Sequence, residues 1–255
     1  MEKFKLMFKN LKGMFMNDKN QYQAGKFIKG EVSGIKGWEW VYLLGLLAIQ
    51  VATFFFTKEV DNSTMGMLTA IANIFCVFLV AKGKMSNYLF GIFYAGFYFI
   101  ISMQHFVLGE AALATFYFVM QFVGLYTWSL NMHEVTGDES EVVESKTLDA
   151  KGWFVTLAST AILYTIIVML LIAFKSNSPM QDALTTSVSI IAQILMTKRF
   201  AEQWIMWIVV NVLQLWLWIK VGDAAMIAMT VAILINSTYG YINWLAMNRE
   251  QKRTA

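Results

Sequence analysis

The sequence predicts an all-α polytopic membrane protein with about eight transmembrane helices. Apolar and aromatic residues make up 58% of the 255 residues, and charged residues make up only 15%, well below the roughly 25% of a soluble domain. The charges fall in short segments that separate eight long uncharged windows. Lysine and arginine gather in every second one of these segments. A soluble fold would need a polar shell, which this composition cannot supply.

Each uncharged window is predicted to cross the membrane once as a helix. About 20 helical residues cross a hydrocarbon core roughly 30 Å thick, and a helix satisfies its own backbone hydrogen bonds there. The windows are 40–57, 62–81, 85–104, 111–132, 152–174, 183–197, 203–219 and 224–248. The sixth is the shortest, so that helix either tilts less or borrows residues from 176–181.

The N-terminal segment, residues 1–37, precedes the first window. Within residues 1–16 the apolar side chains recur at helical spacing and lysines fill the flanks and the opposite face. The apolar positions are Phe4, Met7, Phe8, Leu11, Met14 and Phe15. This pattern predicts a helix that lies in the membrane interface, and the alternative is a frayed tail.

The distribution of positive charge predicts the orientation. All of the lysines and arginines except Lys58, Lys175 and Lys220 fall on one side of an eight-span chain. Cytoplasmic loops carry this excess, so we expect both termini in the cytoplasm and an even number of spans. The acidic 132–151 segment is interpreted as a plain solvated connector.

The two halves of the chain resemble each other at an offset of 115 or 116 residues. The Lys-Gly-Trp triplet of 36–38 recurs at 151–153, and Gly-Leu-Tyr-Thr-Trp of 124–128 is answered by Gly-Tyr-Ile-Asn-Trp of 240–244. Four spans separate the matches, so the repeats run in parallel. Parallel repeats are a transporter architecture with a solute site near the midplane, although a channel or a membrane enzyme could also arise by duplication.

Polar and aromatic side chains inside the windows are the candidate solute-binding residues, because such groups are costly in a membrane unless they face a partner or a cavity. The candidates are Asn73, Tyr94, Tyr98, Gln121, Trp204, Trp207, Asn211, Gln214 and Asn236. Amides can pair with a carboxamide or with sugar hydroxyls, and indoles stack on flat rings and attract flat cations. The set favours a neutral or cationic nucleoside-like solute.

Purely structural roles are the alternative to solute binding for these residues. Asn and Gln often bond one membrane helix to another, and tryptophans near span ends often anchor in the interface. We favour the anchor interpretation for Trp128, Trp204, Trp218 and Trp244. The site interpretation is favoured for Trp207, Asn211 and Gln121, which lie at mid-depth.

No catalytic motif is present in the sequence. It contains no HExxH, no GxSxG and no P-loop, and no Asp, Glu, Lys, Arg or His lies within any window. Cys76 is its single cysteine. A cysteine-cluster metal site is therefore excluded. We expect no enzyme activity, no cofactor and no bound metal.

A family resemblance rests on three motifs. Residues 202–211, Glu-Gln-Trp-Ile-Met-Trp-Ile-Val-Val-Asn, resemble the central motif of the PnuC nicotinamide riboside transporters. The stretch 118–128 resembles that family's other signature, and 240–244 its C-terminal counterpart. The likeness covers about residues 65–248. It implies facilitated diffusion of a vitamin B3 precursor, with alternating access between two three-helix bundles similar to those of the SWEET transporters.

The resemblance also implies an organisation and partners. A linker helix joins the two bundles in a 3+1+3 plan, and the first span is an addition. The ranges are 1–37 for the N-terminal segment, 38–64 for the added helix and loop, 65–131 for the first repeat, 132–175 for the acidic loop and linker helix, 182–248 for the second repeat and 249–255 for the tail. The implied location is the bacterial inner membrane. The implied partners are the lipid bilayer and a cytosolic kinase that traps the solute. A homo-oligomer stays open, and no nucleic acid is implied.

The same resemblance implicates Trp207, Asn211 and Gln121 in contact with the solute. Two alternative functions remain: transport of another aromatic B vitamin such as thiamine or riboflavin, and a non-transport membrane enzyme. The windows contain no proline, so we expect the bundles to rock as rigid bodies.

Overall fold

The computed structural model describes residues 5–6, 9, 12, 24–56, 64–134, 141–176, 178–222 and 224–254. Most of the interfacial helix predicted for residues 1–16 lies outside these ranges. The chain divides into two compact units, Met1–Glu144 and Ser145–Ala255, and each unit is described by itself.

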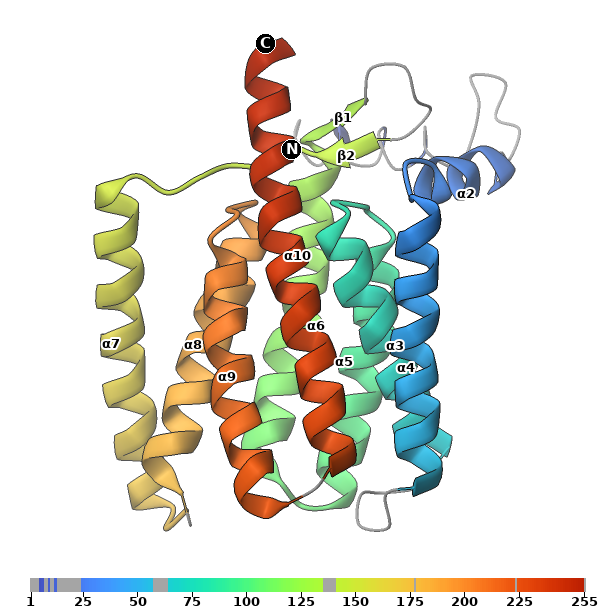
Figure 1. The fold of residues 1–255 in the computed structure, drawn as a ribbon. Coiled ribbons are helices and arrows are strands. Elements are labelled where there is room, and N and C mark those ends of the chain that lie inside the picture. The colour runs from blue at the N-terminus through green and yellow to red at the C-terminus, as the bar shows by residue number, and fades with distance from the viewer. Residues whose placement is uncertain are drawn as a thin grey trace. The chain divides into compact units, whose positions relative to one another are not determined.

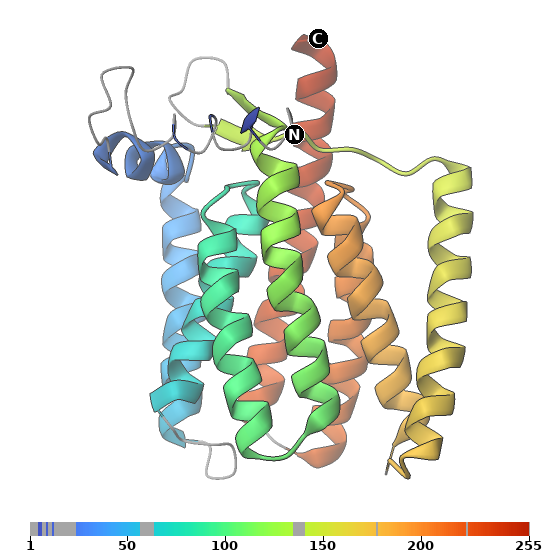
Figure 2. The same ribbon diagram turned by 180° about the vertical axis from the view of Figure 1, so that it is seen from behind.

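The first unit is built from helices that pack in chain order (Figure 1). Its helices are α2 Ala24–Val32, α3 Gly37–Phe56, α4 Thr64–Ala81, α5 Asn87–Gln104 and α6 Leu108–Ser129. α3 packs against α4, α4 against α5 and α5 against α6. The same neighbours are visible from behind in Figure 2. α5 and α6 are therefore antiparallel neighbours that can share side-chain contacts along their length.

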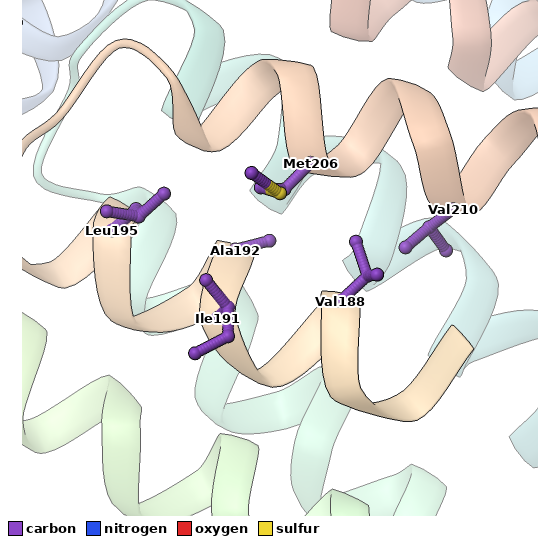
Figure 3. Packing of buried hydrophobic residues seen from close by; sticks show 6 residues of the cluster. All are labelled: Val188, Ile191, Ala192, Leu195, Met206 and Val210. Carbon is purple, nitrogen blue, oxygen red and sulfur yellow. The ribbon is translucent and has the colours of Figure 1, made fainter. Parts of the chain in front are cut away.

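The second unit repeats this order of packing. Its helices are α7 Ala150–Ala173, α8 Pro179–Thr197, α9 Gln203–Val221 and α10 Ala224–Thr254. An apolar cluster joins α8 to α9, and Figure 3 shows its members Val188, Ile191, Ala192, Leu195, Met206 and Val210. Asp149 caps α7 by accepting a hydrogen bond from the Gly152 N–H at 2.7 Å. Pro179 occupies the first turn of α8, where its missing N–H is tolerated.

Eight helices of 18 to 31 residues correspond to the eight predicted windows. The shortest window gains residues at its N-terminal end and becomes the 19-residue α8. α10 runs past residue 248 into the predicted tail and ends at Thr254. Within the described ranges, α4, α6, α7 and α9 are long and apolar enough to cross a membrane by length and composition alone. α7 exposes Phe154, Ile162 and Met169 most strongly, as expected of a helix bathed in lipid.

The internal repeat extends to the backbone. Gly83 follows α4 with φ 66°, and Arg199 follows α8 with φ 69°. Phe106 lies between α5 and α6 with φ 56°, and Gly222 lies between α9 and α10 with φ 80°. Both pairs are separated by the 116 residues of the sequence repeat. Because left-handed conformations are uncommon away from glycine, this correspondence supports a common ancestry of the two halves.

The plain-connector interpretation of the acidic segment is corrected for residues 132–134 and 141–146, which form hydrogen-bonded structure. β1 Met132–Glu134 and β2 Glu141–Val143 form an antiparallel pair. The Val143 N–H donates to the Gly83 carbonyl at 3.0 Å, which ties β2 to the α4–α5 turn. In the second unit, Lys146 exchanges backbone hydrogen bonds with Arg199 and Ala201, both at 2.8 Å. The sequence-based interpretation missed this structure because it rests on backbone N–H and C=O groups, whose hydrogen-bond partners cannot be read from amino-acid composition.

Candidate functional site

The facing surfaces of α5 and α6 form a continuous seam in the first unit, which we call the α5–α6 seam. A Cβ atom added to Gly124 would lie 2.4 Å from the Tyr88 ring, and one added to Gly91 would lie 2.2 Å from the Gln121 amide oxygen. At the other end of the seam Tyr98 donates a hydrogen bond to Glu110. From one residue pair to the next, the α5 residue number rises while the α6 residue number falls, as expected of antiparallel helices. All these groups therefore share one interface.

Gln121 lies at the centre of this seam and is buried. Its Nε2 donates to the Tyr117 carbonyl at 3.3 Å, one turn earlier in α6. Its Oε1 has no hydrogen-bond partner among the described residues. A buried amide oxygen without a partner is costly, so the seam contains a polar atom that the described residues do not satisfy.

Tyr94 and Tyr98 lie one turn apart on α5 and stack on each other. Their ring centroids are 5.7 Å apart and their planes differ by 12°. Both side chains are half-buried, whereas Glu110 is exposed. The seam therefore runs from an exposed carboxylate, through two aromatic faces, to a buried amide.

The α9–α10 pair of the second unit carries an equivalent contact. A Cβ atom on Gly240 would lie 2.5 Å from the Trp204 indole, just as Gly124 supports Tyr88. Two turns along α9, Asn211 is buried and its Nδ2 donates to the Ser237 Oγ at 3.0 Å. Ser237 donates in turn to the Ile233 carbonyl at 3.1 Å. Asn211 thus bonds α9 to α10 in the second unit.

The other predicted site residues occupy varied surroundings. Trp207 is half-buried and packs against the α8–α9 apolar cluster. Asn236 of α10 is fully buried, Gln214 of α9 is exposed, and Asn73 of α4 is half-buried. In the first unit, α5 and α6 bring Gln121, Tyr94 and Tyr98 onto one seam. In the second unit, α9 carries Trp204, Trp207 and Asn211 along its first two to three turns.

The anchor interpretation is wrong for three tryptophans. Trp128 and Trp244 are fully buried, and Trp204 is 2% exposed. Trp128 packs edge-on against Tyr88 with ring centroids 5.1 Å apart. An interfacial anchor must reach the lipid headgroups, and these indoles are enclosed by protein. Trp218, near the end of α9, is half-exposed.

Three residues that were not predicted as site residues lie on the same helices as the candidates. Ser237 is the repeat counterpart of Gln121, 116 residues later, and this offset was the signal that could have found it. Glu110 lies in the first turn of α6, outside the uncharged window. Gln203 is fully buried, and neither polar atom of its amide has a partner among the described residues.

Comparison with known proteins decides the family. Over residues 63–246 the chain matches the family described as nicotinamide mononucleotide transporter. The chain belongs to this family. The match spans α4 to most of α10, so the nicotinamide mononucleotide transporter family accounts for both halves of the internal repeat.

Named relatives of this family are closely similar to the chain. The nicotinamide riboside transporter PnuC of Haemophilus influenzae is 38% identical over 214 residues, which are 84% of this chain and 92% of that protein. The protein of the same name from Neisseria mucosa is 38% identical over 218 residues, 82% of each chain. A solved structure described as the crystal structure of the vitamin B3 transporter PnuC superposes with a TM-score of 0.73 at 36% identity, covering 85% of this chain and 94% of that one. These similarities confirm the predicted polytopic, nearly all-helical fold of a membrane transporter.

Proposed function

We propose that this chain carries nicotinamide riboside across the bacterial inner membrane by facilitated diffusion, without chemical change to the solute. The relatives at 38% identity are named for this solute. In the proposed arrangement α4–α6 and α8–α10 are the two three-helix bundles of a 3+1+3 plan, α7 is the linker and α3 is an addition. Both termini face the cytoplasm, and a cytosolic kinase traps the solute by phosphorylation.

The observation that carries the proposal is the chemistry of the buried groups at mid-helix. Gln121 and Asn211 are buried amides on α6 and α9, with Trp207 one turn from Asn211. Amides offer both donors and acceptors to a carboxamide and a ribose. An indole face attracts the flat pyridinium cation. Nicotinamide riboside presents all three of these features.

The charge pattern favours the riboside over its 5′-phosphorylated mononucleotide, which appears in the family's description. The windows of α4 to α10 contain no lysine, arginine or histidine. A phosphate buried without a cationic partner has a large desolvation cost. The mononucleotide should therefore bind much more weakly than the riboside.

Calorimetric titration of the purified protein tests the solute. Nicotinamide riboside should give saturable heat, whereas the mononucleotide, thiamine and riboflavin should give little or none. Equal affinities for riboside and mononucleotide would contradict the phosphate argument. Preferential binding of thiamine or riboflavin would support transport of another B vitamin.

Variants of the buried groups test the site. Trp207→Ala should weaken riboside binding by about 1–2 kcal/mol, as for a desolvated cation–π contact. Trp218→Ala is the matched control and should change the affinity little, because Trp218 lies near the end of α9. Parental affinity in a folded Trp207→Ala protein would show that the site lies elsewhere.

A further inference from the structure

Glu110 is the exposed end of the α5–α6 seam and has no role in the function proposed above. It lies in the first turn of α6, at the end of the α5–α6 pair opposite the α4–α5 turn. It accepts a hydrogen bond from the Tyr98 hydroxyl through Oε2, and this is the one bond that the structure gives it among the described residues. Its carboxylate is otherwise open to solvent.

The register of the two helices links Glu110 to the buried amide. On α6, Tyr117 and Gln121 lie 7 and 11 residues after Glu110, and both intervals return to nearly the same helical face. On α5, Tyr98, Tyr94 and Gly91 share a face in the same way, and Gly91 meets Gln121. Eleven residues of helix span about 16 Å. Glu110 therefore lies on the line that leads to Gln121, although too far away to touch a solute bound there.

The groups near Glu110 are suited to a flat cation. Tyr98 donates a hydrogen bond to the carboxylate, and Tyr94 and Tyr98 present two nearly parallel rings. A carboxylate attracts positive charge, and tyrosine faces bind planar cations. No other acidic residue occurs in α5 or α6. One negative charge beside two ring faces therefore marks one end of an otherwise uncharged seam.

We propose that Glu110, Tyr98 and Tyr94 form an entrance subsite that recruits planar organic cations at the exposed end of the α5–α6 seam. The inference rests on the proposed function, in which the solute carries a pyridinium. Under the proposed orientation the subsite opens to the outer side of the membrane. Its negative charge raises the local concentration of the cation and the rate at which the carrier is loaded.

A pair of conservative variants separates this role from a structural one. Glu110→Gln removes the charge but keeps an oxygen that can accept from Tyr98. Tyr98→Phe removes the hydrogen bond but keeps the ring and the charge. A brace between helices would be weakened by Tyr98→Phe, whereas recruitment of a cation would be weakened by Glu110→Gln.

Two solutes of matched shape isolate the charge. Nicotinamide riboside carries a cationic ring, and its 1,4-dihydro form is neutral with the same carboxamide and ribose. Initial uptake into sealed proteoliposomes gives kcat/KM for each solute at low and at about 0.15 M ionic strength. For Glu110→Gln, kcat/KM of the cation should fall about fivefold at low ionic strength. The deficit should shrink with salt, because exposed charges are screened, and the neutral form should be unaffected.

The outcomes distinguish the inference from the function on which it rests. An equal loss for both solutes, or a Tyr98→Phe protein that reproduces the loss of Glu110→Gln, would overturn the entrance subsite while leaving the transport function intact. Unchanged kcat/KM for the cation in Glu110→Gln at low ionic strength would overturn it as well. Absence of saturable uptake by the parent protein would overturn the proposed function and this inference together.

Discussion

At the scale of single residues, two glycines lie in close contact with large aromatic side chains of the neighbouring helix. Gly124 supports Tyr88 in one unit and Gly240 supports Trp204 in the other. Both pairs occupy equivalent positions of the repeat. Neither ring can easily move away from an added methyl group, because Tyr88 and Trp204 are themselves buried. The glycines are therefore required for close approach of the helices.

Alanine at either position should destabilise the protein. Gly124→Ala and Gly240→Ala should each lower the free energy of unfolding by about 1–3 kcal/mol, as for an overpacked core. Gly45→Ala is the control, since a Cβ there meets nothing within 4 Å, and it should be neutral or stabilising. Thermal unfolding in detergent measures all three. A Gly240→Ala protein as stable as Gly45→Ala would show that the indole can move aside.

Glu202 is a second residue whose surroundings give a testable expectation. It lies in the turn before α9 and is 5% exposed, with one carboxylate oxygen unpartnered among the described residues. Burial raises the pKa of this carboxyl, although backbone hydrogen bonds from Glu202 itself and Leu148 oppose the shift. The folded state therefore favours the protonated form of Glu202.

The pH dependence of stability should reveal this shift. A raised folded pKa contributes stability below the unfolded value, about 4.3, and that contribution is lost as pH rises through the folded pKa. Glu202→Gln keeps an acceptor and removes the charge. Its Tm should match the parent near pH 4 and exceed it at pH 7. A Tm difference that does not change with pH would contradict this assignment.

At the scale of elements, a buried ion pair holds helix α3 against the α4–α5 turn. Lys82 Nζ lies 3.0 Å from both carboxylate oxygens of Glu39, and the Lys36 N–H donates to the same carboxylate at 2.7 Å. Glu39 is 2% exposed. The sequence windows placed Glu39 outside the first span, whereas α3 begins at Gly37 and includes it.

Removal of one partner should be costly. Lys82→Met leaves a buried carboxylate without its counter-charge and should lower the free energy of unfolding by about 3–5 kcal/mol. The double variant Glu39→Leu with Lys82→Met should recover much of the loss, because no charge stays buried. Lys198→Met is the matched control, since Lys198 is the repeat counterpart of Lys82 and is exposed. Chemical denaturation in detergent compares them, and equal effects of Lys82→Met and Lys198→Met would contradict the buried-pair argument.

The two repeats also differ at the element scale, where a solute site is proposed. Gly91 of α5 corresponds to Trp207 of α9, and Gln121 of α6 corresponds to Ser237 of α10. The aromatic-on-glycine contacts are conserved between the repeats, whereas these positions one turn deeper have diverged. Gln121 and Trp207 are two of the site residues proposed above, and neither is matched by a similar residue in the other repeat.

At the scale of the whole molecule, transport should be passive. Proton-driven carriers usually hold an acidic or basic residue inside the membrane, and the windows contain no Asp, Glu, Lys, Arg or His. Imposed proton or sodium gradients at clamped zero potential should not drive accumulation of nicotinamide riboside above equilibrium in proteoliposomes. Preloaded unlabelled solute should accelerate exchange, and net flux of this cation should respond to voltage. Uphill accumulation driven by either ion at zero potential would contradict a uniporter.

The sequence alone determined the number and the positions of the eight long helices, whereas α2, β1 and β2 were not predicted. Uncharged runs in hydrocarbon must form helices, and the eight windows became α3 to α10. The ends shifted by four residues or fewer, apart from the C-terminal end of α10, which extends from residue 248 to Thr254. The offset of 115 or 116 residues predicted a repeat, and the positive φ angles of Gly83 and Arg199 lie at this offset. Family membership was also foreseeable, because its motifs are local.

Only the tertiary structure decided which side chains meet. Helices that are apolar on every side leave their rotation and register open, since each face is equally compatible with lipid or protein. The contacts of Gln121 with Gly91, of Asn211 with Ser237 and of Tyr98 with Glu110 depend on that register. The burial of Trp128 and Trp244 depends on it too. The sequence determines how far along a span each residue lies, whereas the packing of one helix against the next determines the direction in which its side chain points.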